Sequence, residues 1–243
     1  MKDSARGHRK VLIGLTLASL VGGVFGDYFL PRNAAAQPAD IVTYKPPQRG
    51  APGGREGAGT RGPGRPLPTL AVLTPKEHTG LTIQAQPVLY WYLSQETQHP
   101  VDIILTDRQS VKPLLETRLH PPLQPGIQLV RLADYNIRLA PGVAYKWSVS
   151  LITDPTQHSR DIVTAGTLER IDLPDELQSQ LVQADKRASA RLYALAGLWY
   201  DAIATLSELI DTVPQDTLLR QQRATLLDQE GLTEAAAYDR QRK

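Results

Sequence analysis

The chain between residues 69 and 171 consists of short apolar-rich runs separated by turn residues. In several runs apolar and polar residues alternate, and this period of two is typical of half-buried β-strands. About seven such runs within roughly a hundred residues predict an antiparallel β-sandwich over residues 69–171. The clearest alternation places Tyr145, Trp147, Val149 and Leu151 against Lys146, Ser148 and Ser150.

A motif inside this region narrows the type of sandwich. Residues 139–149 read L-x-P-G-x-x-Y-x-x-x-V, which resembles the approach to strand F in fibronectin type III and other immunoglobulin-like domains. In those domains a tyrosine hydroxyl bonds back to the backbone at a corner between the two sheets. The resemblance implies an immunoglobulin/fibronectin-III-like sandwich with Tyr145 as its corner tyrosine, and it implies no activity.

From Leu173 onward the spacing of apolar residues becomes helical, and a repeat appears. Four residues recur 34 positions later, which is the period of tetratricopeptide repeats. Small residues let two helices approach closely, a glycine makes the turn between them, and a proline ends the second helix. The residues that resemble the repeat pattern are Ala190, Tyr193, Gly197, Ala202 and Pro214, followed by Ala224, Gly231 and Ala236.

We therefore expect an α+β multidomain chain, with a tetratricopeptide-like helical hairpin in residues 172–243 after the sandwich. The alternative is an ordinary helical hairpin with coincidental spacing. Only one repeat and part of a second fit, whereas about three are usually needed to bury a continuous core. The helices should therefore pack on the sandwich or on another protein.

The N-terminal residues predict export. Lys2, Arg6, Arg9 and Lys10 precede an uncharged apolar run over residues 11–26. The triplet Ala34-Ala35-Ala36 then has the spacing that a signal peptidase recognises, so residues 1–36 are interpreted as a signal peptide. The alternatives are an uncleaved membrane anchor facing outward and a buried core helix. We expect the protein in the periplasm or cell envelope, with membrane contact only through an uncleaved N-terminal segment.

Residues 37–68 are rich in glycine, proline and arginine. Between Lys45 and Pro68, thirteen of 24 residues are Gly or Pro. The same stretch has five basic residues and one acidic residue, Glu56. This composition favours a flexible tether, or a loop whose Arg49, Arg55 and Arg61 contact an anion or a partner's carboxylates. Its G-x-G-x-x-G spacing lacks the preceding strand and following helix of a dinucleotide site, and export disfavours nucleic acid.

The stretch RGAPGGREGAGTRG, followed by LTPKEHTGLTIQAQPVLYWYL, resembles an uncharacterised family of exported cyanobacterial proteins, domain of unknown function 928. The resemblance covers residues 49–163, with Gly54 where an arginine is often expected. It implies that the arginine tract is more than a spacer. It implies no activity.

Candidate chemistry is sparse. The chain has no cysteine and five histidines, none in an H-E-x-x-H pattern. Glu77 and His78 are adjacent, so on a strand they would point to opposite faces. No G-x-S-x-G elbow places a serine nucleophile. We therefore expect no catalytic residues, no metal and no cofactor.

Three functions remain at this point. The favoured one is a non-catalytic envelope protein that binds another protein through its helices and sandwich. The first alternative is a glycan or surface-polymer binding module, with Tyr90 and Tyr92 of VLYWYL as an aromatic platform beside the arginine tract. For VLYWYL itself, packing in the core is the favoured interpretation. The second alternative is an envelope enzyme that carries no recognisable motif.

Overall fold

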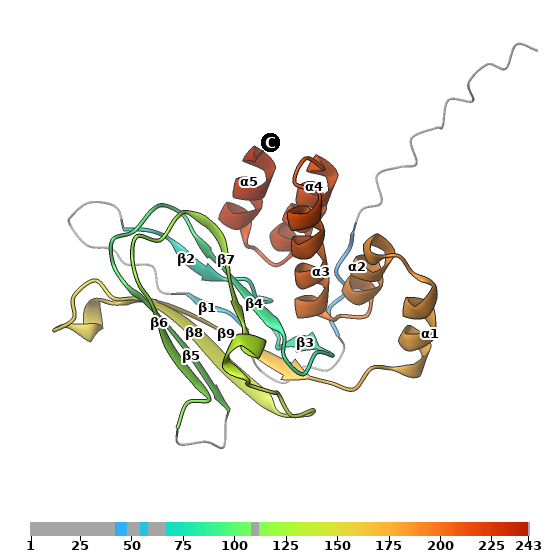
Figure 1. Ribbon diagram of the computed structural model, residues 1–243, viewed down its shortest axis with the longest axis horizontal. Helices are drawn as coiled ribbons and strands as arrows, with labels where there is room; N and C mark the ends of the chain where they lie inside the picture. The colour runs from blue at the N-terminus through green and yellow to red at the C-terminus, as the bar shows by residue number, and fades with distance from the viewer. Residues whose placement is uncertain (1–41, 48–53, 58–66, 108–111, 243) are drawn as a thin grey trace, which may run out of the picture. The chain divides into compact units, whose positions relative to one another are not determined.

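The computed structural model describes residues 42–47, 54–57, 67–107 and 112–242. They belong to one compact unit, Pro38–Lys243, in which antiparallel sheets precede five C-terminal helices (Figure 1). The predicted signal segment and the candidate residues Arg49 and Arg61 lie outside the described residues. Within the described ranges, no helix is both long and apolar enough to cross a bilayer.

The larger sheet has the strand order β1-β9-β8-β5-β6, with β3 also paired to β9. All of these pairs are antiparallel except β3–β9. Because β8 occupies one edge of β9, both β1 and β3 lie along its other edge and shield it from further pairing. The strands are β1 (Glu56–Gly57), β3 (Gly80–Thr82), β5 (Val101–Asp107), β6 (Leu115–Leu119), β8 (Ala144–Leu151) and β9 (Ile162–Arg170).

The smaller sheet consists of β2 (Leu70–Val72), β4 (Val88–Leu93) and β7 (Gly126–Arg131), in the antiparallel order β2-β4-β7. Short 3₁₀ turns cover Leu132–Tyr135 and His158–Arg160. The alternation predicted for residues 145–151 is confirmed, since the four apolar side chains of β8 are buried and the polar ones between them are not.

The helices follow from Asp175 onward, and consecutive helices pack together as two hairpins, α2 with α3 and α4 with α5. Gly197 and Gly231 lie between the members of each pair with φ of 77° and 68°, a left-handed conformation that favours glycine. Asp185 and Asp216 cap α2 and α4 by accepting backbone N–H bonds. The helices are α1 (Asp175–Gln183), α2 (Lys186–Leu195), α3 (Trp199–Thr212), α4 (Thr217–Gln229) and α5 (Thr233–Gln241).

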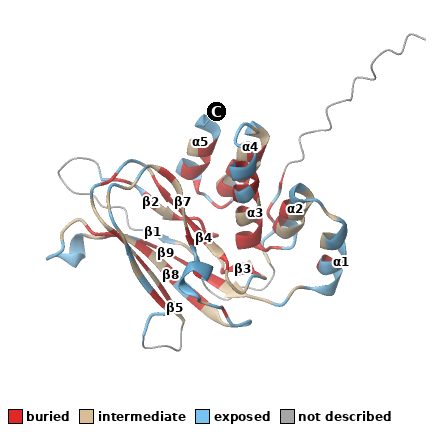
Figure 2. Ribbon diagram, in the orientation of Figure 1, coloured by how far each residue is buried: buried red, intermediate tan, exposed pale blue. Residues whose placement is uncertain are grey.

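Sheets and helices share one hydrophobic core. The β2–β4–β7 sheet lies between the larger sheet and the helices (Figure 1), and α3 contacts β3 and β4 while α5 contacts β7. Figure 2 shows the buried residues running from the strands into the inner faces of the helices. Residues 69–171 and 172–243, which the sequence suggested as separate domains, are therefore packed onto each other.

Two aromatic residues of α3 join these layers. The Trp199 indole donates to the carbonyl of Leu73 at 2.8 Å. The Tyr200 hydroxyl accepts from Nε1 of Trp147 at 3.0 Å, donates to the carbonyl of Thr167 at 3.2 Å and is also hydrogen-bonded to the hydroxyl of Thr74. Burial raises the pKa of Tyr200 to about 12, so its hydroxyl keeps its proton.

Candidate functional site

Arg55 is the one member of the predicted arginine set that the structure describes, and its donors are used within the chain. Its guanidinium donates to the carbonyls of Thr74 at 3.1 Å, Glu230 at 3.1 Å and Gly231 at 3.4 Å. Burial lowers its pKa, and the carboxylate of Glu230 opposes that shift. A cation at the C-terminus of α4 is favourable because helix carbonyls there lack partners. Arg55 therefore ties the arginine tract to both the sheet and the helices.

A second tie is the N-terminal strap, defined as residues 42–47. Val42 and Tyr44 are buried while Thr43 and Lys45 are exposed. The backbone N–H of Tyr44 donates to Oε1 of Gln229 in α4, and that of Lys45 donates to the carbonyl of Ala194 in α2. The strap therefore covers the ends of two helices with this chain's own residues, and that surface is not open to a partner.

Tyr145 has the contact expected of a corner tyrosine. Its side chain is buried, and its hydroxyl accepts from the backbone N–H of Ala140 at 2.9 Å. Its role is to hold the turn before β8, so it is no candidate for ligand contact.

The core packing favoured for VLYWYL is confirmed, and the alternative of an aromatic platform is wrong. Tyr90, Trp91 and Tyr92 are 5%, 0% and 6% exposed. The cause is that β4 is covered on both faces: Tyr92 packs against Tyr238 of α5 at a ring distance of 5.8 Å, and alternation turns Trp91 toward the larger sheet. No glycan can stack on these rings while the helices cover them.

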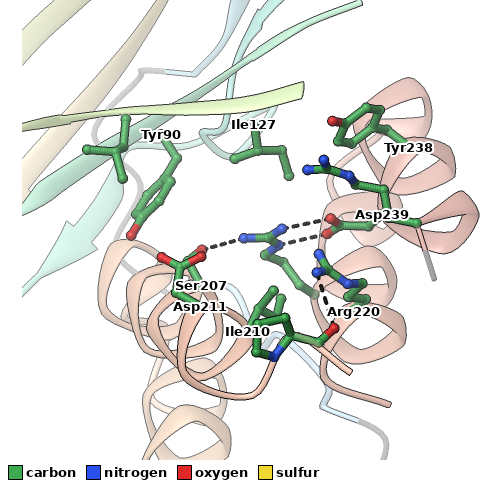
Figure 3. Close-up of a pocket in the computed structure, with 12 residues that line it drawn as sticks. Tyr90, Ile127, Ser207, Ile210, Asp211, Arg220, Tyr238 and Asp239 are labelled. Carbon is green, nitrogen blue, oxygen red and sulfur yellow. Dashed lines mark hydrogen bonds and ion pairs between the residues drawn. The ribbon is translucent and has the colours of Figure 1, made fainter. Parts of the chain in front are cut away.

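The helices instead enclose a pocket of about 230 Å³ against the smaller sheet (Figure 3). We call it the arginine pocket. Its wall combines residues of β4 and β7 with residues of α3, α4 and α5, and its polar groups are mostly charged. It is lined by Tyr90, Ile127, Leu129, Ser207, Ile210, Asp211, Pro214, Arg220, Arg223, Tyr238, Asp239 and Arg242.

One arginine of this pocket is fully paired. Arg223 donates to both carboxylate oxygens of Asp239 at 2.7 Å and to the hydroxyl of Ser207 at 2.7 Å. Arg223 and Asp239 are 6% and 0% exposed. A buried pair of this kind is tolerated only with such complete hydrogen bonding. It therefore forms a structural part of the wall and contributes little net charge.

Two further arginines are not paired with a carboxylate in this pocket. Arg220 donates to the carbonyl of Pro214 at 3.4 Å, and its Nε has no acceptor. The guanidinium of Arg242 lies over the ring of Tyr238, 5.5 Å from the centroid. Against these two cations the lining offers one exposed carboxylate, that of Asp211. The pocket is therefore suited to an anionic group, and a carboxylate matches the planar fork of arginine.

Sequence reasoning missed this pocket. Its arginines lie on or next to helices whose only recognised signal was the spacing of small residues, and its sheet residues come from strands at least ninety positions before those arginines. The described residues contain no group of three or more His, Asp or Glu side chains that could hold a metal ion. What fold and pocket define together is an α+β protein with a charged recess where sheet meets helix.

The chain belongs to a family described as Domain of Unknown Function (DUF928), whose profile matches residues 56–239. The match spans both sheets, helices α1 to α4 and most of α5, and it includes every residue of the arginine pocket except Arg242. A search of the curated proteins found no match.

Proposed function

We propose that the protein is a non-catalytic, exported protein of the cell envelope that binds another protein, and that a carboxylate of this partner enters the arginine pocket. The observation that carries the proposal is the pair of cations at this pocket, Arg220 with an Nε that lacks an acceptor and Arg242 on the Tyr238 ring. Arginine and tyrosine are also the residues enriched in protein–protein hot spots.

The size of the pocket supports a side chain over a small molecule. At about 230 Å³ it is smaller than most small-molecule sites, which run from roughly 300 to 1,000 Å³. A recess of this size suits one Asp or Glu side chain, or a C-terminal carboxylate, presented by a larger surface. Arg49 and Arg61 remain candidates for additional contacts with acidic residues of the same partner.

The proposal also includes a more specific assignment of the two parts of the fold. Consecutive strands pass from β4 in one sheet to β5 and β6 in the other, back to β7, and again to β8 and β9. This Greek-key-like order and the Tyr145 corner support an immunoglobulin/fibronectin-III-like sandwich. The two helix pairs with glycine turns support a tetratricopeptide-like unit. Both architectures commonly present binding surfaces for other proteins.

Export rests on residues 1–36 alone. Cell fractionation followed by N-terminal sequencing tests it. A mature start near Gln37 in the periplasmic or envelope fraction is expected. An intact start at Met1 in the membrane fraction would replace cleavage by anchorage, and recovery in the cytosol would refute export.

Site-specific crosslinking tests the partner surface. Val213 precedes the pocket residue Pro214 and is 44% exposed, so a photo-crosslinking amino acid at this position reports what approaches the arginine pocket. Leu114, 40% exposed beside β6, is the matched control on the larger sheet. We expect a defined protein adduct in living cells from position 213 and none from position 114.

The chemistry of the contact is tested in the same assay. Combining the crosslinker at position 213 with Arg220→Gln and Arg242→Gln should reduce the adduct at least fivefold, and added salt should reduce the wild-type adduct, since both changes weaken pairing with a carboxylate. The proposal fails if the adduct survives both arginine substitutions, or if both crosslinker positions capture the same proteins.

A further inference from the structure

A second pocket lies on another face of α3. We call it the Asp201 pocket. It measures about 380 Å³ and is lined by Gln84, Gln86, Pro87, Val88, Lys186, Ser189, Tyr193, Asp201, Ala204, Thr205 and Glu208. Its four α3 residues follow the spacing i, i+3, i+4, i+7 and therefore share one helix face. The α3 residues of the arginine pocket are different ones, so the two sites can be altered separately.

Asp201 is the buried charged residue of this lining. It is 3% exposed, whereas Lys186 and Glu208 are exposed. Oδ2 of Asp201 accepts the backbone N–H of Ile83 at 3.1 Å, and Oδ1 has no hydrogen-bond partner. A buried carboxylate oxygen without a donor is costly, and native structures seldom retain one without a reason.

No cation of the described lining pairs with Asp201, whose ionised form is stabilised only by hydrogen-bonding groups, including the side chains of Thr82 and Gln84. Lys186 is the basic residue of the lining, and its ammonium is 2.7 Å from the carboxylate of Glu208. Burial raises the pKa of Asp201 to about 6 despite hydrogen bonds that oppose the shift, so the carboxylate is still mostly ionised at neutral pH. A buried carboxylate that lies in a pocket, with one oxygen lacking a donor and no paired cation, is a candidate for ligand contact.

We infer that the Asp201 pocket binds a primary ammonium group, whose N–H donors reach Oδ1 of Asp201 and whose positive charge neutralises it. Pro87, Val88 and Ala204 supply apolar lining for an alkyl stem, and Gln84, Gln86 and Ser189 supply hydrogen-bonding groups. This inference does not depend on the carboxylate site proposed for the arginine pocket.

Other ligand classes fit less well. A neutral sugar could donate to Oδ1 but would leave the buried charge uncompensated. A metal ion prefers several ligands, and no group of three His, Asp or Glu side chains exists in the described part of the chain. The ammonium group has two sources, the lysine side chain of a protein and a free diamine, and the probes below separate them.

The test is calorimetric titration of the protein at pH 7 with Nα-acetyl-lysine amide and with 1,5-diaminopentane. We expect saturable binding of both, tighter for the lysine amide if the source is a protein and tighter for the diamine if it is a free amine. Nα-acetyl-norleucine amide, which keeps the alkyl chain without the charge, and methyl α-glucoside should each bind at least tenfold more weakly.

Two variants locate the site. Asp201→Asn keeps the acceptor for Ile83 but removes the charge, and it should weaken amine binding at least tenfold with an unchanged circular dichroism spectrum. Asp134→Asn makes the same change at an exposed carboxylate outside both pockets and should bind as the wild type does. The inference is overturned if Asp201→Asn binds amines normally, or if the norleucine amide or the glucoside binds wild type as tightly as the amines.

The pH dependence gives a third readout. The titratable groups facing Asp201 are Lys186 and Tyr193 of α2 and Glu208 of α3, and the strand-side lining has none. Between pH 7 and pH 5 the ionised fraction of Asp201 falls from about nine-tenths to about one-tenth, so amine affinity should fall roughly tenfold. A flat affinity across this range would contradict binding through Asp201.

Discussion

The substitution Tyr200→Phe should weaken the hydrogen-bonded junction between helix α3 and the sheets without removing apolar packing. The lost hydroxyl accepts from Nε1 of Trp147 and bonds to Thr74, and all three side chains are fully or almost fully buried. Phenylalanine keeps the ring in place. The variant therefore leaves a buried indole N–H without an acceptor and a buried threonine hydroxyl without its partner.

Each buried polar group left unpaired costs about 1–3 kcal/mol. The Trp147 N–H counts fully, whereas the Thr74 hydroxyl can rotate toward another acceptor. The Tyr200 hydroxyl also donates to the carbonyl of Thr167 at 3.2 Å, and the loss of this longer hydrogen bond adds a smaller amount. We therefore expect a loss of about 2–4 kcal/mol in the free energy of unfolding.

Urea denaturation followed by tryptophan fluorescence measures this loss. The three tryptophans, Trp91, Trp147 and Trp199, are all fully buried and lie in the sheets and in α3, so they report on both layers. Tyr135→Phe is the matched control, because its hydroxyl bonds to Thr117 at an exposed position and should be worth less than about 0.5 kcal/mol. If Tyr200→Phe and Tyr135→Phe lower the free energy of unfolding equally, the hydrogen bonds of Tyr200 do not stabilise the contact between α3 and the sheets.

Two other substitutions test single hydrogen-bonded groups. Tyr145→Phe removes the acceptor of the Ala140 N–H and should lower the free energy of unfolding by about 1–3 kcal/mol in the same assay; an unchanged urea midpoint would exclude a corner role. Asp239→Asn breaks the buried pair with Arg223 and should cost about 3–5 kcal/mol, whereas Asp228→Asn, which breaks the exposed pair with Arg240, should cost less than about 1 kcal/mol.

The parts of the fold that the sequence predicted are those with a local physical signal. The alternation at residues 145–151 shows which face of a strand is buried without reference to any other segment. Gly197 and Gly231 were expected at turns between helices, and both have positive φ there. Secondary structure, the order of sheets before helices and the membership of the family could all be inferred from such signals.

The packing of one layer on another had no such signal. VLYWYL is apolar on both faces, which indicates a strand covered on both sides but does not say what covers it. The helices do so, and their position excludes the alternative of an aromatic platform. The N-terminal strap was hidden for a similar reason, since its alternation extends over only a few residues next to a glycine- and proline-rich tract.

The two pockets could not be predicted from the sequence because their walls combine segments that are far apart along the chain. Arg223 meets Asp239 through the turn between α4 and α5, and Asp201 meets Ile83, a residue 118 positions away. A lone aspartate at the start of a helix is also expected for helix stability, because the N-terminus favours negative charge. Only its burial and its unpartnered oxygen distinguish Asp201 from a surface aspartate such as Asp134.

That distinction predicts how stability depends on pH. The pKa of Asp201 is raised to about 6 in the folded protein from an ordinary value of 3.8, so the folded state binds the proton more tightly than the unfolded state. Its contribution to stability is therefore fully present below pH 3.8 and is lost as the pH rises through about 6. A difference of about two pKa units corresponds to about 3 kcal/mol at pH 7.

Asp201→Asn removes this titration and should be more stable than the wild type at pH 7, by up to about 3 kcal/mol, while matching it near pH 4. Urea midpoints at several pH values measure the difference, in which all other titrating groups cancel. Asp134→Asn should show no such divergence. If wild type and Asp201→Asn stay parallel from pH 4 to 7, the carboxylate is not buried as described. If they diverge, the chain retains at position 201 a charge that lowers its own stability at neutral pH, and a bound cation would recover that loss.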